Sequence, residues 1–165
     1  EAIFDADVVL NAFTERFKNE FKDFALDVKV RDFNPGERFK ISASRKDSTI
    51  DVKIWAHNAS ALRYALNAML KWHKSATEDS LELEDGPAFG FRGVIEGFYG
   101  VPWTHEQRLR GIANFADFNM NTFMIAPKDS PWQRFKWRAP FTEDFLVKII
   151  FKRTDYFNNF FTYSS

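Results

Sequence analysis

Hydrophobic residues recur at steps of four near the start of the chain, where Val9, Phe13, Phe17 and Phe21 follow one another within residues 6–21. An α-helix turns once in about 3.6 residues, so this spacing places the four side chains on one helical face. The intervening residues are largely charged and polar. The pattern predicts an amphipathic helix that packs one face against a core.

Three segments then change to a two-residue alternation, which is typical of strands with one buried face. They are FALDVKVRDF (24–33), FKISASR (39–45) and TIDVKIWA (49–56). NPGE separates the first from the second as a turn, and RKDS joins the second to the third as a short hairpin-like connection. We therefore expect three strands over residues 24–56.

A second helix is expected after Asn58, which is suited to cap its first turn. The helical spacing comes from Leu62, Ala65, Leu66, Met69 and Leu70. Helix, three strands and helix over residues 1–75 predict a small α+β domain, with helices layered on one sheet. Its two histidines, His57 and His73, have no metal-ligand spacing and are expected at the surface or at helix ends.

Residues 76–90 are acidic and contain the dipeptide Gly86-Pro87, a composition typical of a linker. Three of their acids could be taken for a carboxylate site, but on a connector they are expected to be solvated charges. These acids are Glu82, Glu84 and Asp85.

From residue 91 onward, short apolar runs alternate with helical patterns. FRGVIEGF reads as a strand, and Thr104 with Gln107 forms a capping box that begins a helix. MNTFMIAP (120–127) reads as the next strand, and another helix is expected to begin at Thr142. This alternation favours a parallel sheet or a barrel, in which ligands meet the loops after the strands. The buried stripe of the first of these helices is expected to comprise Leu109, Ile112, Ala113 and Ala116.

Amino-acid composition and charge argue against several classes of function. The 165 residues carry 23 basic and 23 acidic side chains, so no electrostatic signature of nucleic-acid binding is present. No run of about 18 apolar residues predicts a membrane span. Zero cysteines exclude disulfides and thiolate metal sites in this sequence without fixing the compartment. The 20 phenylalanines are expected mainly in cores, with some left to line a groove.

The two loops after the predicted strands carry unusual residues. The first, GFYGVPW, combines glycine with Phe98, Tyr99 and Trp103. The second places Lys128 and Asp129 at a strand end, followed by the aromatic and basic residues Trp132, Arg134, Trp137 and Arg138. Aromatic faces with directed polar groups suit a sugar ring. Aromatic and basic loops also bind phosphates, single-stranded nucleic acid and proteins, so these alternatives stay open at this point.

The two motifs RGVIEGFYGVPWTHEQR and MNTFMIAPKDSPWQRFKWRAPF resemble the start of the catalytic barrel of glycoside hydrolase family 84. This family comprises β-N-acetylglucosaminidases, including protein O-GlcNAcases and bacterial hyaluronidase-like enzymes. The resemblance covers about residues 85–145, and it implies that a small α+β domain precedes the first strand–helix units of an incomplete (β/α)8 TIM barrel. It implies no cofactor and no metal.

The resemblance also implies roles for individual residues. The main-chain carbonyl of Gly97 would bind a sugar hydroxyl, and Lys128 would hydrogen-bond the same N-acetylglucosamine. Phe98, Tyr99 and Asp129 could line the pocket. The implied partner is an N-acetylglucosamine-containing glycan or an O-GlcNAc-modified protein.

Other residues of the first motif are expected to serve the fold. Gly93 and Gly100 would shape the strand and the turn that follows it. Glu96, with glycines on both sides, is expected to be a buried structural acid that holds this turn.

The implied mechanism is retaining and substrate-assisted: the acetamido oxygen of the substrate attacks the anomeric carbon, helped by an Asp-Asp pair. This sequence contains no Asp-Asp dipeptide, and we expect the pair downstream of Ser165, so that no catalytic residue is present. Ser130 and Ala139 depart from the residues that relatives usually carry. Glu143-Asp144 falls in the first turn of a predicted helix and is no substitute.

A complete barrel needs about 250 residues, so residues 91–150 are expected to supply only its beginning. Residues 151–165 show no helical stripe and no expected strand, and we interpret them as an atypical tail, out of frame or following a truncation. The leading hypothesis is an inactive fragment of a β-N-acetylglucosaminidase. The alternatives are a non-catalytic carbohydrate-binding module and a small α/β interaction domain formed by residues 1–75.

Overall fold

The computed structural model describes residues 6–30, 36–75, 77–126, 128–136 and 138–140, and the backbone of residues 159–162. The chain divides into two compact units, which we call the N-terminal unit (residues 1–90) and the C-terminal unit (residues 91–165). Both combine helices with a sheet, so the mixed α/β class expected from the sequence is confirmed.

The N-terminal unit begins with two helices where the sequence predicted one. Helix α1 covers Ala6–Arg16 and the short helix α2 covers Lys18–Phe21. Between them Phe17 has φ −117° and ψ 29°, which interrupts the helical path. The expected apolar face persists through this break, because the rings of Phe13 and Phe21 still meet edge to face at 5.6 Å.

A four-stranded sheet follows, in the order β1-β3-β2-β4. Strands β2 and β3 form the expected hairpin, and its turn places Asp47 at φ 51°. Strand β1 pairs with β3 in parallel, a feature that alternation alone did not specify. The strands are β1 (Phe24–Val30), β2 (Phe39–Lys46), β3 (Thr49–Ala56) and β4 (Ser80–Asp85).

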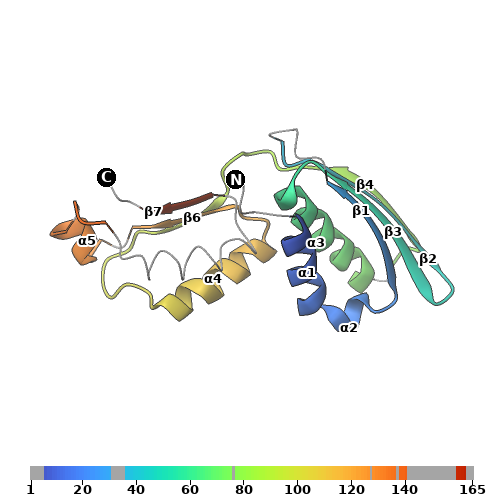
Figure 1. Ribbon diagram of the computed structural model, residues 1–165, viewed down its shortest axis with the longest axis horizontal. Helices are drawn as coiled ribbons and strands as arrows, with labels where there is room; N and C mark the ends of the chain where they lie inside the picture. Colours follow the sequence, from blue (N-terminus) through green and yellow to red (C-terminus); the bar gives the residue numbers. More distant parts are fainter. Residues whose placement is uncertain are drawn as a thin grey trace. The chain divides into compact units, whose positions relative to one another are not determined.

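Helices α1 and α3 (Ala59–Ser75) cover one face of this sheet and enclose the main core (Figure 1). Asn58 caps α3 as expected, since the backbone N–H of Ala61 donates to its Oδ1 at 2.9 Å. At the far end of α3, Arg45 stacks on Trp72 at 4.5 Å and donates to the carbonyl of His73 at 3.2 Å. His73 thus lies at a helix end, as predicted. Fully buried members of the core include Ile41, Ile54, Leu62, Leu66 and Met69.

The interpretation of residues 76–90 as a linker missed strand β4. Leu81 and Leu83 pack against the main core, whereas Glu82 and Glu84 point away from it. The two-residue alternation was present in SLELED, but the dense charge obscured it. Antiparallel pairing with β2 makes this segment an edge strand, where charged side chains are common.

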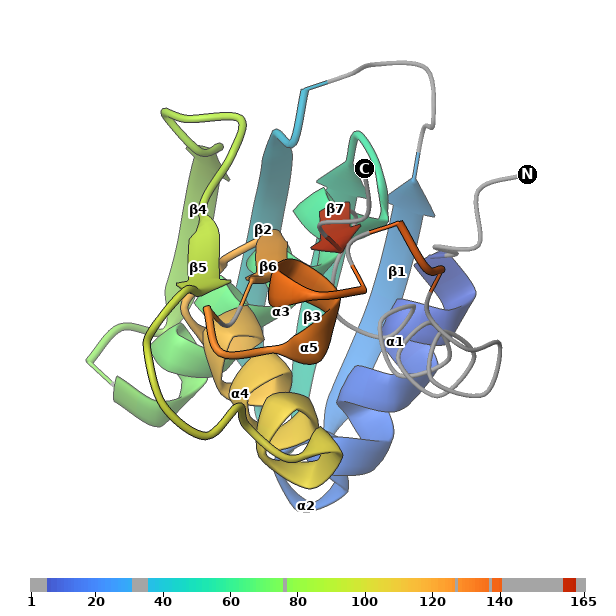
Figure 2. The ribbon, with the colours of Figure 1, turned by 90° about the vertical axis from the view of Figure 1, so that its left-hand side faces the viewer.

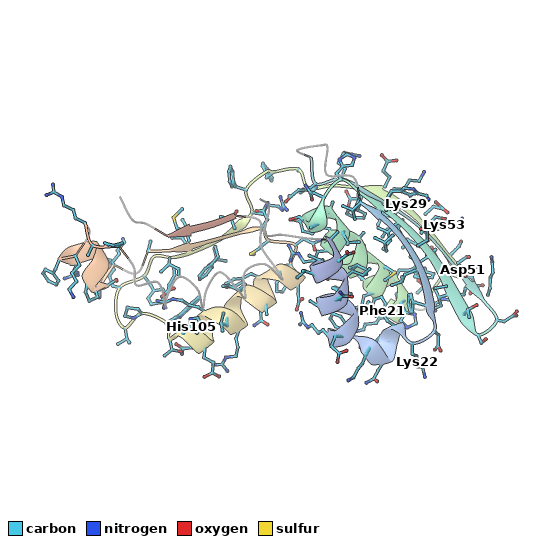
Figure 3. The ribbon with its side chains drawn as sticks, viewed as in Figure 1. Phe21, Lys22, Lys29, Asp51, Lys53 and His105 are labelled. Atoms are coloured by element: carbon cyan, nitrogen blue, oxygen red, sulfur yellow. The ribbon has the colours of Figure 1, made fainter. Side chains whose placement is uncertain are left out.

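The opposite face of the sheet is polar. Figure 3 shows Lys29, Asp51 and Lys53 on the side of the strands away from the helices. Because side chains alternate along a strand, the apolar core on one face leaves this charged set on the other.

The C-terminal unit contains a parallel sheet in the order β5-β6-β7. Helix α4 follows β5 after a wide loop (Figure 2) and begins with the predicted capping box, in which Thr104 and Gln107 satisfy each other's backbone N–H groups. The elements are β5 (Gly93–Glu96), α4 (His105–Asp117), β6 (Thr122–Ile125), α5 (Pro131–Arg134) and β7 (Asn159–Thr162).

A small core joins α4 to this sheet, and it comprises Ile112, Ala116, Phe123 and Ile125. Ile112 and Ala116 are therefore buried as expected from the stripe of α4. Leu109 and Ala113, the other two expected members, are only half-buried.

Strand β7 corrects the expectation that residues 151–165 hold no strand. Residues 159–162 pair with β6 in parallel, with Thr122 opposite Asn159 and Ile125 opposite Thr162. With only four residues, NFFT is too short for a two-residue alternation to stand out in the sequence. The helix expected from Thr142 lies outside the described residues.

Candidate functional site

The loops that follow β5 and β6 lie side by side. Beyond the last paired residues of the two strands, the N–H of Ala126 donates to the carbonyl of Glu96, and the N–H of Lys128 donates to that of Phe98, each at 3.1 Å. This continued parallel pairing brings together the two loops that the sequence marked as unusual. We call residues 97–104 loop one and residues 126–130 loop two.

Gly97 lies between the two carbonyls that accept from loop two. Among the strands that the structure describes, β5 is an edge of its sheet, so only one side of it carries a neighbouring strand. A Cβ on Gly97 would lie 3.2 Å from Cγ2 of Ile95, so a larger residue would require a small adjustment.

Lys128 and Tyr99 meet directly. The Lys128 ammonium lies 4.7 Å from the centre of the Tyr99 ring, within the range of a cation–π interaction, and Tyr99 is 70% exposed. Phe98 instead contacts Trp103, with ring centroids 5.5 Å apart, and Trp103 packs against the small core. Of the three aromatic residues predicted in loop one, Tyr99 is the one whose side chain is largely exposed.

Asp129 joins the two loops through its carboxylate. Oδ2 accepts from the N–H of Gly100 at 2.6 Å, and Oδ1 accepts from Nη2 of Arg134. Nε of Arg134 donates to the carbonyl of Lys128 at 3.0 Å. The sequence marked Arg134 only as one of the aromatic and basic residues that follow Asp129, without a role of its own. In the structure it lies at the end of α5, five residues after Asp129.

Two glycines of the first motif serve the fold, as predicted. At Gly93 a Cβ would lie 1.9 Å from the carbonyl oxygen of Thr122, so only glycine permits β5 to approach β6 this closely. Gly100 has φ 103°, a left-handed conformation that L side chains rarely adopt. This turn directs the Gly100 N–H toward Asp129.

Glu96 is a structural acid, which confirms its interpretation from the sequence. It is fully buried, and Arg108 donates to both of its oxygens, from Nε at 2.7 Å and from Nη2 at 2.9 Å. The N–H of Trp103 also donates to Oε1 at 3.0 Å. These bonds tie the end of β5 to helix α4 and to the end of loop one. Arg108 was not identified from the sequence, although it lies four residues before Ile112 on the buried stripe.

Other residues considered for chemistry have ordinary surroundings. Ser130 is buried at the start of α5, and its side chain makes no capping hydrogen bond there. Glu82 accepts from Ser42, and Glu84 lies 3.7 Å from Arg38. Asp85 accepts from the N–H of the next residue at 2.7 Å. These acids therefore lie on a sheet edge rather than in a catalytic pair.

The part of the chain that the structure describes contains neither a metal-binding cluster nor a membrane-spanning helix. No group of three or more His, Cys, Asp or Glu side chains is placed to hold a metal ion. None of the helices described there is both long and apolar enough to cross a membrane.

Neither the Glu143-Asp144 pair nor the expected Asp-Asp pair belongs to the part of the chain that the structure describes. Glu143 and Asp144 lie among the residues that are not described. Ser165 is the last residue of the sequence and is not described either, so the Asp-Asp pair expected downstream of Ser165 has no counterpart in the structure. That expectation stays a prediction.

Comparison with known proteins connects this site to a family. Residues 92–155 match the family model described as beta-N-acetylglucosaminidase, so the match extends into the segment that was interpreted as a tail. A 50-residue stretch is 42% identical to the protein O-GlcNAcase of Rattus norvegicus and covers 30% of this chain, but only 6% of the rat protein.

Two solved structures are similar over a larger part of the chain. CpGH84B has a TM-score of 0.57 and 25% identity, with 74% of this chain and 22% of that chain covered. CpGH84D has a TM-score of 0.56 and 24% identity, with 93% of this chain and 25% of that chain covered, a likeness that concerns the fold. The chain therefore spans about a quarter or less of the length of the proteins that it matches.

Proposed function

Because this chain belongs to glycoside hydrolase family 84, we propose that its C-terminal unit is the first part of a (β/α)8 barrel and forms one wall of an N-acetylglucosamine site. The pairing of loop one with loop two is the observation that supports this most directly. It places Lys128, Tyr99 and the Gly97 backbone at the carboxyl ends of neighbouring parallel strands, where such barrels bind their ligands.

Each residue of this wall has a chemical task in the proposal. The Gly97 carbonyl accepts a hydrogen bond from a sugar hydroxyl, and the Lys128 ammonium donates to another oxygen of the same ring. The largely exposed Tyr99 ring covers the apolar side of the sugar. Phe98 contacts Trp103, which packs against the small core, and so connects loop one to that core. The bound sugar is a terminal N-acetylglucosamine on a glycoprotein or glycan.

The proposed reaction is retaining and assisted by the substrate. The acetamido oxygen attacks the anomeric carbon while an acid protonates the departing oxygen, and water then opens the resulting ring. In this scheme one aspartate orients the acetamide, and the adjacent aspartate protonates the departing oxygen and later activates water. The 165 residues contain no Asp-Asp dipeptide. We therefore expect this polypeptide to bind N-acetylglucosamine without hydrolysing its glycosides.

The absence of that dipeptide also supports the second candidate, a non-catalytic carbohydrate-binding module. Titration with N-acetylglucosamine, followed by NMR, tests the sugar site, and incubation with a chromogenic N-acetylglucosaminide tests the proposed inactivity. Saturable binding without turnover is expected. Turnover that Lys128→Ala abolishes would contradict the proposed inactivity, and no saturable binding would contradict the sugar site.

A matched control identifies the contribution of the site. Lys128→Ala should remove detectable binding, whereas Lys71→Ala, an exposed lysine on α3 in the other unit, should leave it unchanged. Equal losses for both variants would mean that the sugar responds to general charge instead of this wall.

A further inference from the structure

We propose that Asp129 and Arg134 are positioning residues, which lock loop two onto loop one and so hold Lys128 in place, and that neither binds the sugar itself. The inference rests on the proposed function for its sugar-binding consequence. Its structural part, the locking of Lys128, stands on contacts in the C-terminal unit alone.

The carboxylate of Asp129 has both oxygens engaged with protein. Oδ2 accepts from the Gly100 N–H of loop one, and Oδ1 pairs with the Arg134 guanidinium. A sugar hydroxyl that bound Asp129 would compete with a backbone donor in a left-handed turn and with a cation. Asp129 therefore connects two protein segments in this arrangement.

Arg134 holds the main chain next to Asp129 as well. One side of its guanidinium pairs with the Asp129 carboxylate, and Nε donates to the Lys128 carbonyl at 3.0 Å. A planar guanidinium can make these two contacts at once, which an ammonium cannot reproduce with the same geometry. Arg134 thereby fixes two successive residues of loop two.

Lys128 is consequently held on both sides of its α-carbon. Its N–H donates to the Phe98 carbonyl at 3.1 Å, and its carbonyl accepts from Arg134. With the backbone fixed in this way, the side-chain torsions are the main freedom left, and the ammonium lies over Tyr99. A preorganised cation loses less conformational entropy when a ligand binds.

The expected size of the effect distinguishes positioning from direct binding. Asp129 is 34% exposed and Arg134 is 51% exposed, so their ion pair is partly screened by water. Its loss should weaken N-acetylglucosamine binding by about three- to tenfold, in line with exposed charge pairs and their hydrogen bonds. Removing Lys128, by contrast, removes a contact with the sugar.

The test compares Asp129→Asn, Arg134→Gln and Arg134→Lys in the 165-residue chain by NMR. The first readout is the ring-current shift that Tyr99 imposes on the ε-methylene protons of Lys128, assigned with Tyr99→Leu. The second is the dissociation constant for N-acetylglucosamine. Arg110→Gln, an exposed arginine on α4, is the matched control.

We expect Asp129→Asn and Arg134→Gln to reduce the ring-current shift and to weaken binding, while the amide spectrum of α4 and β6 stays native. Arg134→Lys should retain part of the ring-current shift and part of the binding affinity, and Arg110→Gln should change neither. A ring-current shift that survives both Asp129→Asn and Arg134→Gln would overturn the proposal. So would a loss of binding of about a hundredfold or more in either variant, because that would indicate direct contact with the sugar.

The two readouts separate this inference from the proposed function. If the wild-type chain binds no N-acetylglucosamine but the ring-current shift depends on Arg134, the locking is supported and the sugar site is refuted. If the sugar binds and the shift is insensitive to both residues, the sugar site is supported and the locking is refuted.

Discussion

Arg108→Met should destabilise the C-terminal unit by about 3–5 kcal/mol, the cost of breaking a buried ion pair from one side. Glu96 is fully buried, and its carboxylate receives two hydrogen bonds from Arg108, at 2.7 and 2.9 Å. In the variant only the Trp103 N–H, at 3.0 Å, would still stabilise this charge. The unpaired carboxylate then has to be protonated, exposed to water or tolerated at high cost.

Hydrogen exchange of backbone amides measures this effect within one unit. The amide of Ala126, which donates to the Glu96 carbonyl, is a direct reporter for the end of β5. Since about 1.4 kcal/mol corresponds to a factor of ten, its exchange should accelerate by roughly a hundredfold to several thousandfold, or lose protection altogether.

Two further variants make the result specific. Arg110→Met changes an exposed arginine of the same helix and should alter stability by no more than about 0.5 kcal/mol. The double variant Glu96→Gln with Arg108→Met should recover part of the loss, because no uncompensated charge remains. If Arg108→Met matched Arg110→Met, the assignment of Glu96 as a structural acid held by Arg108 would be refuted.

Three other predictions concern the fold. Gly93→Ala should lower the free energy of unfolding, measured by urea titration, by about 1–3 kcal/mol or more, because the new Cβ would lie 1.9 Å from a carbonyl oxygen of β6. In the same titration Gly90→Ala should be nearly neutral, because a Cβ there has no atom within 4 Å. Thr104→Ala removes both the N-cap and its capping box, and circular dichroism melts should show a loss of about 0.5–2 kcal/mol; a change below this range would argue against the cap. Burial lowers the pKa of His73 below 6.5, and the nearby Arg45 guanidinium lowers it further. As the pH falls, the unfolded chain therefore binds a proton at His73 before the folded chain does. Stability should therefore be full above about pH 6.5 and decline as pH drops from there toward the folded-state pKa, and His73→Gln should flatten that part of the profile measured by urea unfolding.

Local signals in the sequence located most elements of the fold. The period of apolar residues placed α3 and α4, and cap chemistry at Asn58 and Thr104 fixed where each helix begins. The β2–β3 hairpin and the parallel pairing of β5 with β6 also agree with the predictions. These features depend on neighbours within about ten residues, or on a strand–helix–strand alternation that has few alternatives.

Besides the short helix α5, which falls in a stretch interpreted as a loop, three features of the fold were missed because their sequence signals were weak or masked. The helix breaks at Phe17 although the apolar stripe continues through it, and no residue nearby in the sequence predicts the break. Strand β4 is highly charged, and its leucines became meaningful only beside β2. Strand β7 is only four residues long, and its pairing with β6 is what identifies it as a strand.

The candidate site shows the same division. From the sequence alone came its location at two strand ends, the family resemblance, and the residues Gly97, Tyr99 and Lys128. The structure adds that Lys128 lies over Tyr99, that Asp129 and Arg134 bind the two loops together, and that Arg108 neutralises Glu96. Periodicity and motif chemistry act between near neighbours and can be read along the chain. The partner of a buried charge, or of a carboxylate between two loops, is chosen by distances in space, and only the tertiary structure sets those distances.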